Sequence, residues 1–532
     1  MAKNQNTKST VKSVKPVKPV YEIIEKYFWF IIPLFTLVYY FSSKYSLGFY
    51  QDDEIAQYLN MIEFWTNPSV ILGNNPKPGW KIFTVIPALI SYDAVLIFNS
   101  FIASLTVYFT YRLIKLYEIP YAFFGALLLG MQPLFFDLSF RSYSEIFTAL
   151  LIIFFLILYK KEQFILSSLI LGYIYTVRQE IAVFIILFAI VLIVNKKFIP
   201  VIFLGVFPLL YNLLGFFKTG DILFVLTEMK SVAGLNYASQ GIFHYFKFYI
   251  FIIGPVSLLM FIFGFFGFLA DTKRIKDYLL KYLLFYLLFL SIFVIQTMTM
   301  INDGPNPGNW RYLLHISPIA AFFATVGLNN LSKESFRKSS FILSGILMIL
   351  TLAFLSKVSD GFKFLEPAQS DFTKTLFLVL TFGITLIFAI KNKTDYLNKV
   401  SLLIIIAGII YLAIDFKPKV LSPENVAVKT TAEYLNKLGK QDINIYTNHS
   451  LLKFYSDNYR KNPNGFLSIN SKNLSEMQKG SIVAWESHYG YRPEFTSDVK
   501  LETLQADSSF KMINQVVSSD RRFAAFIFEK LK

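Results

Sequence analysis

The chain has 532 residues, of which 55% are hydrophobic and only 16% are charged, and its formal net charge is +16. Soluble globular proteins carry about 25% charged residues, so this chain is too apolar to cover its own surface in water, and we expect it in a lipid bilayer. Its basic residues fall in short clusters between apolar runs, as in cytoplasmic loops, which argues against nucleic acid as a partner.

Residues 1–20 contain five lysines and no apolar core, so we expect a basic cytoplasmic tail rather than a cleavable signal. A hydrocarbon core is crossed by about 20 mostly apolar residues. Residues 21–415 contain thirteen apolar segments that approach this length, and they are predicted to form a transmembrane domain. The segments are 27–43, 94–112, 121–137, 145–159, 163–177, 181–195, 198–216, 248–270, 279–300, 311–328, 340–356, 374–390 and 399–415.

The distribution of lysine and arginine predicts the orientation of the chain in the membrane. Counted from a cytoplasmic N-terminus, all six loops expected in the cytoplasm carry basic residues. We therefore expect a multi-pass protein of the cell (inner) membrane whose C-terminal region is extracytoplasmic. The basic residues are Arg112, Lys115, Lys160, Lys161, Lys196, Lys197, Lys273, Arg274, Lys276, Lys333, Arg337, Lys338, Lys391 and Lys393.

Residues 416–532 have the composition of a soluble domain. Residues 424–438 follow a proline and have a helical pattern. Strands are expected at three segments that are rich in β-branched and aromatic residues, 442–447, 481–485 and 523–528. The predicted fold is thus an α-helical polytopic membrane protein with a small extracytoplasmic α/β domain.

A run of three acidic residues stands in the outer loop 44–93, directly after the first span. The residues that follow place Ile55, Leu59 and Ile62 on one helical face, which predicts an amphipathic helix lying in the membrane interface. One acidic residue would suffice to cap this helix, so three of them also indicate a functional site. The acidic residues are Asp52, Asp53 and Glu54.

Three arginines are predicted at the outer ends of spans, and two of them are accompanied by a carboxylate. A guanidinium fork suits a phosphate group, so these arginines are candidate phosphate-binding residues that converge on one outer cavity. Two lysines of the first outer loop are candidates for the same role. Ion pairs between helices and snorkelling to the interface stay open as alternatives. The residues are Arg141 with Glu145 in FRSYSE, Arg178 with Glu180 in TVRQE, Arg311 followed by Tyr312, and the lysines Lys77 and Lys81.

The sequence contains no Gly-rich phosphate loop and no G-x-S-x-G motif, so a site that hydrolyses ATP is not expected. The four histidines lack metal-ligand spacing, and structural roles are expected for them. In the C-terminal domain, His449, Glu486 and His488 form no recognisable triad, so this domain is expected to cover the cavity or guide an acceptor.

The layout resembles that of the GT-C superfamily of membrane glycosyltransferases, which includes protein O-mannosyltransferases, aminoarabinose transferases and lipid-linked mannosyltransferases. Its members carry an acidic pair soon after the first span, and Asp53-Glu54 in QDDEIAQY match it, with Asp52 as a second candidate for the aspartate. RSYSE and NWRYLLHISP resemble arginine-bearing segments of several members. The chain departs from the pattern, since no His-Pro precedes the acidic pair and only Asp137 suggests a second acidic motif. The subfamily, and whether a divalent metal ion is required, therefore stay open.

The resemblance implies a transferase of the cell envelope that uses a polyprenyl-phosphate sugar, either a mannose-like hexose or a pentose. The acceptor is a glycan, a lipid or a protein. Asp53 is then the general base, with Asp52 as the alternative and Glu54 in support, and the outer arginines stabilise the leaving phosphate. Two other classes stay open: a lipid-linked glycan polymerase or ligase of another fold, and a glycolipid flippase or transporter.

Overall fold

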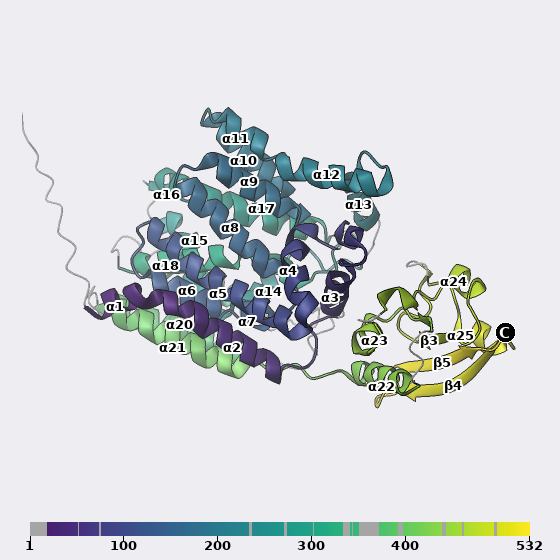
Figure 1. Cartoon of the computed structure of the whole chain (residues 1–532). Helices are drawn as coiled ribbons and strands as arrows, with labels where there is room; N and C mark the ends of the chain where they lie inside the picture. Colours follow the sequence, from purple (N-terminus) through teal and green to yellow (C-terminus); the bar gives the residue numbers. More distant parts are fainter. Residues whose placement is uncertain are drawn as a thin grey trace, which may run out of the picture.

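The computed structural model describes residues 19–532, except 52, 74–75, 234–236, 271–273, 302, 333–340, 343, 351–371, 392–396, 439–442, 460–461 and 494–496. Most of the described residues form a bundle of helices, and a small region with a β-sheet follows at the C-terminus (Figure 1). The predicted tail of residues 1–20 lies almost wholly outside the described residues.

Five helical stretches of the described chain are long and apolar enough to cross a membrane, and each coincides with a predicted span. They are Ile23–Tyr45, Tyr92–Leu116, Phe198–Thr219, Trp310–Asn330 and Leu397–Asp415. The corresponding elements are α1 (Pro19–Tyr27), η1 (Phe28–Phe30), α2 (Ile31–Tyr45), α5 (Tyr92–Leu116), α11 (Phe198–Phe203), α12 (Val206–Thr219), η6 (Trp310–Ile316), α18 (Ser317–Asn330) and α21 (Leu397–Asp415).

Two further predicted spans are broken helices. The pair α14 (His244–Ile253) and α15 (Pro255–Phe265) is bent by 115°, and the pair α16 (Ile275–Lys281) and α17 (Leu283–Met298) by 76°. The first break follows from its sequence, because Gly254 adopts a φ of +79° that favours glycine and the next residue is proline, which cannot extend the hydrogen-bond ladder. If each pair is one span, the described residues contain up to seven.

The remaining predicted spans coincide with shorter or interrupted helices. Average hydropathy does not detect such interruptions, because one or two residues change the mean of a long apolar segment very little. An example is Gln132 and Pro133, where a new helix begins inside an otherwise apolar segment. The predicted span 340–356 lies largely outside the described residues, so the number of thirteen spans stays a prediction. The elements are α6 (Ala122–Gly130), α7 (Pro133–Leu138), α8 (Glu145–Lys160), α9 (Phe164–Tyr175), η3 (Gln179–Ile181), α10 (Ala182–Val194), η4 (Gly267–Ala270) and α20 (Phe372–Lys391), of which Thr373–Ile387 is the apolar part.

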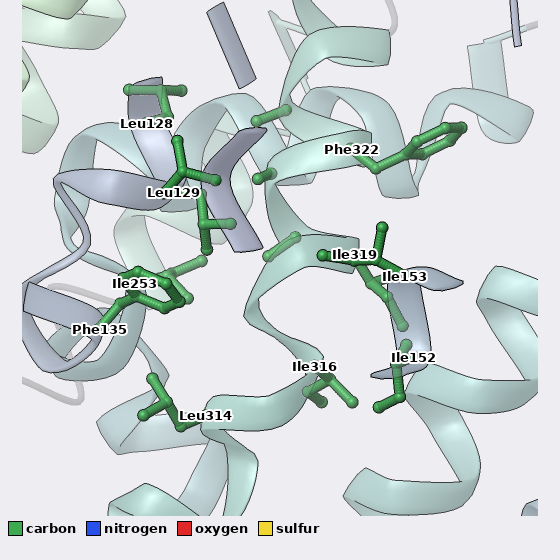
Figure 2. Close-up of a cluster of buried hydrophobic side chains, with 14 of the residues drawn as sticks. Leu128, Leu129, Phe135, Ile152, Ile153, Ile253, Leu314, Ile316, Ile319 and Phe322 are labelled. Atoms are coloured by element: carbon green, nitrogen blue, oxygen red, sulfur yellow. The ribbon is translucent and has the colours of Figure 1, made fainter. Parts of the chain in front are cut away.

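Helices α15 and α18 approach each other closely in the bundle because glycines lie at their contact. A Cβ atom on Gly264 would lie 1.8 Å from the carbonyl oxygen of Phe323, and one on Gly327 would lie 2.2 Å from that of Met260. Small residues allow this close approach of backbones in membrane proteins. Near this contact, apolar side chains from α6, α7, α8, α14, η6 and α18 fill the interior of the bundle (Figure 2).

The C-terminal region forms a five-stranded sheet of order β2-β1-β3-β5-β4, in which β1 is parallel to β2 and β3, and β5 is antiparallel to β3 and β4. Successive residues of a strand point to opposite faces, and β3 is buried on both: Ile482 and Val483 belong to different cores. The elements are α22 (Pro423–Lys437), β1 (Ile445–Tyr446), α23 (Ser450–Tyr455), η9 (Pro463–Gly465), β2 (Phe466–Leu467), α24 (Ser471–Ser475), β3 (Ile482–Glu486), α25 (Leu501–Ala506), β4 (Phe510–Val517) and β5 (Ala524–Lys530).

The predicted C-terminal helix is present as α22, and the three predicted strands are present as β1, β3 and β5. The sequence did not predict β2 and β4. Strand β2 is only two residues long, and β4 (FKMINQVV) lies at the edge of the sheet with several exposed residues, so neither has a continuous apolar pattern.

The predicted outer loop 44–93 contains three helices, α3 (Asp53–Glu63), η2 (Pro68–Ile71) and α4 (Pro78–Ile90), and α13 (Phe224–Ala233) lies in a later loop. Helix α3 packs against α23 of the C-terminal region (Figure 1). Its Ile55 and Leu59 are buried in one core with Ala427 and Leu451. The prediction that this face lies in the membrane interface is therefore wrong, since an amphipathic pattern shows that a face is covered but not what covers it.

Candidate active site

The acidic run lies at the start of α3. Asp53 and Glu54 occupy the first turn of this helix, where its partial positive charge favours carboxylates. Their environments differ, because the side chain of Asp53 is 51% exposed and that of Glu54 is 1% exposed. Asp52 lies outside the described residues.

Glu54 is surrounded by protein donors. Its Oε2 accepts from Nη1 of Arg141 at 3.1 Å and from the backbone N–H of Tyr50 at 3.2 Å. The hydroxyl of Tyr92 donates to its Oε1 at 2.9 Å. A buried carboxylate is stable only with such partners, so Glu54 anchors the start of α3 to the bundle.

Arg141 uses all five of its N–H groups within the protein. Its Nε donates to the carbonyl oxygen of Asp137 at 3.0 Å. Its Nη1 donates to the carbonyl of Gly48 at 2.9 Å and to Glu54. Its Nη2 donates to the hydroxyl of Ser46 at 2.9 Å and to Oδ1 of Asp137 at 3.4 Å. This geometry favours a positioning role for Arg141 over the phosphate binding expected from the sequence.

Arg311, in η6, forms an ion pair with the exposed aspartate. Its Nη2 donates to Oδ2 of Asp53 at 2.6 Å. Its guanidinium lies over the ring of Tyr143, 4.5 Å from the ring centroid, and 5.5 Å from that of Tyr312. Its Nε is buried and has no hydrogen-bond acceptor among the described residues, so Arg311 retains an N–H group that an anion can accept from.

Arg178, directly before η3, pairs with two carboxylates. Its Nη1 donates to Oε1 of Glu145 at 3.0 Å, and its Nε donates to Oε1 of Glu180 at 2.7 Å. The same oxygen of Glu145 lies 4.0 Å from Nε of Arg311, so this carboxylate links the two arginines. Tyr312 lies near both guanidinium groups, since Arg178 is 5.2 Å from its ring centroid. Asp53, Arg311, Glu145, Arg178 and Glu180 thus form one continuous charged cluster.

The two predicted lysines lie at the start of α4 in different surroundings. Lys77 precedes the helix in a left-handed conformation with a φ of +57°. Burial lowers the pKa of Lys77 to about 8, and the positive charge of Arg178 acts in the same direction. Lys81 is fully buried, its Nζ has no hydrogen-bond partner in the described part of the chain, and its charged neighbours are Lys77 and Glu63 rather than the arginines. The structure therefore places Lys77 beside the cluster and Lys81 apart from it.

Three further residues of the site were not predicted from the sequence. Tyr143, whose ring lies under the guanidinium of Arg311, belongs to the FRSYSE segment. Its position in this segment, close to Arg141 and Glu145, was the feature of the sequence that could have identified it as a site residue. His315 lies in the same 3-10 helix as Arg311, fully buried, with neither ring nitrogen hydrogen-bonded to a described residue. Tyr92 had no local signal, because it is distant in sequence from its partner Glu54.

Among the described residues, no group of three or more histidine, aspartate or glutamate side chains is arranged to hold a metal ion. The C-terminal domain contains three such side chains joined by hydrogen bonds, since ring nitrogens of His449 and His488 lie 3.4 Å and 2.7 Å from Oε1 of Glu424. Burial would raise the pKa of Glu424, but its hydrogen bonds with the two histidines outweigh burial and lower the pKa to about 2. This carboxylate is therefore ionised in the folded domain at neutral pH.

No protein-family model matches the sequence, and no curated protein matches it either. Two solved structures are similar in fold. ArnT from Cupriavidus metallidurans bound to undecaprenyl phosphate superimposes with a TM-score of 0.61 at 11% identity, over 96% of this chain and 98% of that one. The apo state of the same protein gives a TM-score of 0.59 at 11% identity, over 95% and 98% of the two chains.

The chain has the ArnT fold. The match extends over nearly the whole chain, so the similarity of fold includes both the helical bundle and the C-terminal sheet. The ArnT fold and the apolar helices make the chain an integral, multi-pass membrane protein with a small C-terminal sheet. Within this ArnT-like fold, the predicted arginines and acidic residues of distant segments meet at the N-terminal end of α3.

Proposed function

We propose that this chain is a glycosyltransferase that moves a sugar from a polyprenyl-phosphate donor to an acceptor on the outer face of the membrane. The observation that carries this proposal is the pair of Asp53 and Arg311, whose Oδ2 and Nη2 atoms are 2.6 Å apart. An exposed carboxylate there stands beside a buried guanidinium whose Nε has no acceptor among the described residues. The ArnT fold supports the proposal, because one ArnT structure is bound to undecaprenyl phosphate.

The residues have separate roles in the proposed reaction. Asp53 takes the proton of the acceptor hydroxyl as its oxygen attacks the anomeric carbon of the donor. The bond between the anomeric carbon and the phosphate oxygen breaks, and the lipid phosphate leaves with the bonding electrons. Negative charge grows on this phosphate, and Arg311 and Arg178 stabilise it. Lys77, with a pKa of about 8, is mostly protonated at neutral pH and adds a third positive charge.

Arg311 also positions the base. Its ion pair holds the Asp53 carboxylate next to the proposed phosphate site, so base and leaving group are oriented by the same side chain. Glu54 and Arg141 act behind this pair, because their buried bonds tie the first turn of α3 to the bundle. The reacting groups therefore stand on a rigid support.

We also propose the orientation and the domains expected from the sequence. Residues 1–20 are cytoplasmic, 21–415 form the transferase domain, and 416–532 form an extracytoplasmic accessory domain of a cell (inner) membrane protein. The basic clusters support this orientation. The packing of α3 on α23 supports it as well, since the acidic motif and the C-terminal domain then lie on the same side.

The sugar is proposed to be a mannose-like hexose or a pentose, and the acceptor a glycan, a lipid or a protein. The test uses the purified chain in lipid nanodiscs with polyprenyl-phosphate mannose and with polyprenyl-phosphate aminopentose as donors, and with glycan, lipid and protein fractions as acceptors. We expect one of the donors to yield a glycoside and free polyprenyl phosphate, and the Asp53→Asn variant to form both about 10²- to 10⁴-fold more slowly. A requirement for a diphosphate-linked donor would instead identify a polymerase or ligase. Movement of the lipid across the bilayer without a glycoside would identify a flippase.

A further inference from the structure

A cavity of about 280 Å³ lies where α3 meets the C-terminal domain, away from the arginine cluster. Its volume is several times the roughly 30 Å³ of a water molecule, and it is large enough for one sugar ring. Aromatic side chains from both sides of the contact dominate its wall. They are Tyr58 of α3, Tyr92 of α5, and Phe454, Tyr455 and Tyr459 of the C-terminal domain.

Leu59 and Ile62 of α3 also line the cavity, and three polar residues of the C-terminal domain complete the wall. Lys453 and Asp457 line the cavity, and so does Ser456, whose buried hydroxyl has no hydrogen-bond partner among the described residues. Burial lowers the pKa of Lys453, and the carboxylate of Glu63 acts against this effect. A buried hydroxyl without a partner is costly, and a simple packing defect between two apolar surfaces would not contain a lysine and an aspartate. The wall therefore has the mixture of aromatic side chains and polar groups that a small polar ligand requires.

The cavity is connected to the acidic motif through Tyr92. This residue lines the cavity, and its hydroxyl donates to Oε1 of Glu54 at 2.9 Å. Tyr58 lies five residues after Asp53 on α3, which is about 7.5 Å along the helix axis. A ring bound in the cavity can thus belong to the same molecule as a hydroxyl that reacts at Asp53.

We propose that this cavity binds one pyranose ring of a glycan acceptor. Aromatic rings pack against the apolar C–H faces of a sugar, while Lys453, Ser456 and Asp457 bond its hydroxyl groups. The site lies at the contact with the C-terminal domain, and Tyr92, the first residue of α5, is its one described lining residue from a membrane helix. This position fits a water-soluble acceptor better than the lipid-linked donor. This inference rests on the proposed glycosyl transfer, of which it specifies the acceptor.

The test measures saccharide binding separately from catalysis. The full chain is placed in lipid nanodiscs, because detergents with sugar head groups would compete. Methyl α-glycosides of mannose, glucose, galactose and N-acetylglucosamine are titrated by saturation-transfer NMR. We expect binding of at least one glycoside, with about a 10-fold or larger loss of affinity in Lys453→Met and about a 2- to 10-fold loss in Ser456→Ala.

Controls separate this inference from the proposed function. Lys437→Met, which changes an exposed lysine of the same domain, should bind as the wild type does. Asp53→Asn should also bind the glycosides, because Asp53 does not line the cavity. If the wild-type chain binds glycosides but transfers no sugar, the proposed function is refuted and this inference is not. The inference is overturned if none of the four glycosides binds, or if Lys453→Met and Ser456→Ala both bind like the wild type. Binding of a serine- or threonine-containing peptide alone would also overturn it, in favour of a protein acceptor.

Discussion

The two arginines that hold the acidic motif differ in how far the protein itself uses their donors. Arg141 donates all five N–H groups to protein acceptors, and its partner Glu54 is buried. Arg311 donates to the half-exposed Asp53, and its Nε has no acceptor among the described residues. We call an ion pair saturated when every N–H group of its arginine has an acceptor in the protein, and such a pair stabilises one backbone arrangement. An unsaturated pair next to solvent still has an N–H group with which it can bind an anion. Adjacent residues of one motif, Asp53 and Glu54, thus belong to the proposed reactive pair and to a structural pair.

The largest effect is expected from removing the proposed base. Asp53→Asn should lower turnover by about 10²- to 10⁴-fold, which is the usual contribution of a general base, and should leave folding and donor binding intact. Steady-state transfer assays measure the turnover, and donor titration measures the binding. Asp52→Asn is the matched control and should cost much less. If Asp52→Asn is inactive and Asp53→Asn is not, the base shifts by one residue; if both are active, this loop does not catalyse glycosyl transfer.

Breaking the saturated pair should cost stability. Arg141→Met leaves the buried Glu54 without its charged partner, and we expect a loss of about 3–5 kcal/mol in the free energy of unfolding. The double variant Arg141→Met/Glu54→Gln should recover part of this loss, because no unpaired charge then stays buried. Unfolding in detergent followed by circular dichroism gives the values, with the exposed Arg112→Met as the control. If the Arg141→Met protein is fully stable but binds the donor weakly, Arg141 binds the donor phosphate, as expected from the sequence.

The unsaturated arginine should act on the donor rather than on folding. Arg311→Ala should weaken donor use by about 10- to 100-fold, as expected for a charge-assisted hydrogen bond. Arg311→Lys should restore little, because an ammonium group does not replace a guanidinium fork. Transfer rates at varied donor concentration show the effect, and thermal unfolding should change much less than in Arg141→Met. Full activity of Arg311→Lys would mean that only the positive charge matters.

The smallest effect is expected from Glu424 in the C-terminal domain, which offers a third kind of pair to compare. Glu424 is paired with two histidines, and its side chain is partly exposed to water. Its pKa in the folded protein, about 2, lies below its ordinary value of 4.5. Its contribution to stability is therefore complete above about pH 4.5 and is lost as the pH falls towards 2. Hydrogen exchange of the domain, corrected for intrinsic rates, should show this loss, and Glu424→Gln should flatten it. Glu433→Gln, an exposed neighbour on α22, should behave like the wild type; a flat wild-type profile would exclude the effect.

Much of this arrangement could be predicted from local sequence alone. Low charge and long apolar runs require a bilayer, whatever the helix packing. The acidic run after the first span and the arginines at the ends of later spans could be identified as candidate site residues, because ionisable groups are costly near lipid wherever they occur. The strands β1, β3 and β5 followed from dense β-branched and aromatic residues. The order of the motifs predicted a resemblance to the GT-C superfamily, and the observed fold is similar to that of ArnT.

Tertiary structure decided how these residues are used. Whether an arginine is saturated depends on acceptors brought from distant segments, such as Ser46 and Gly48 for Arg141, and no local pattern contains that information. The apolar face of α3 was predictable, but its partner was not, because an apolar face is equally satisfied by lipid and by the C-terminal domain that buries Ile55 and Leu59. The sequence thus determined which residues had to find partners, and the fold determined which partners they found.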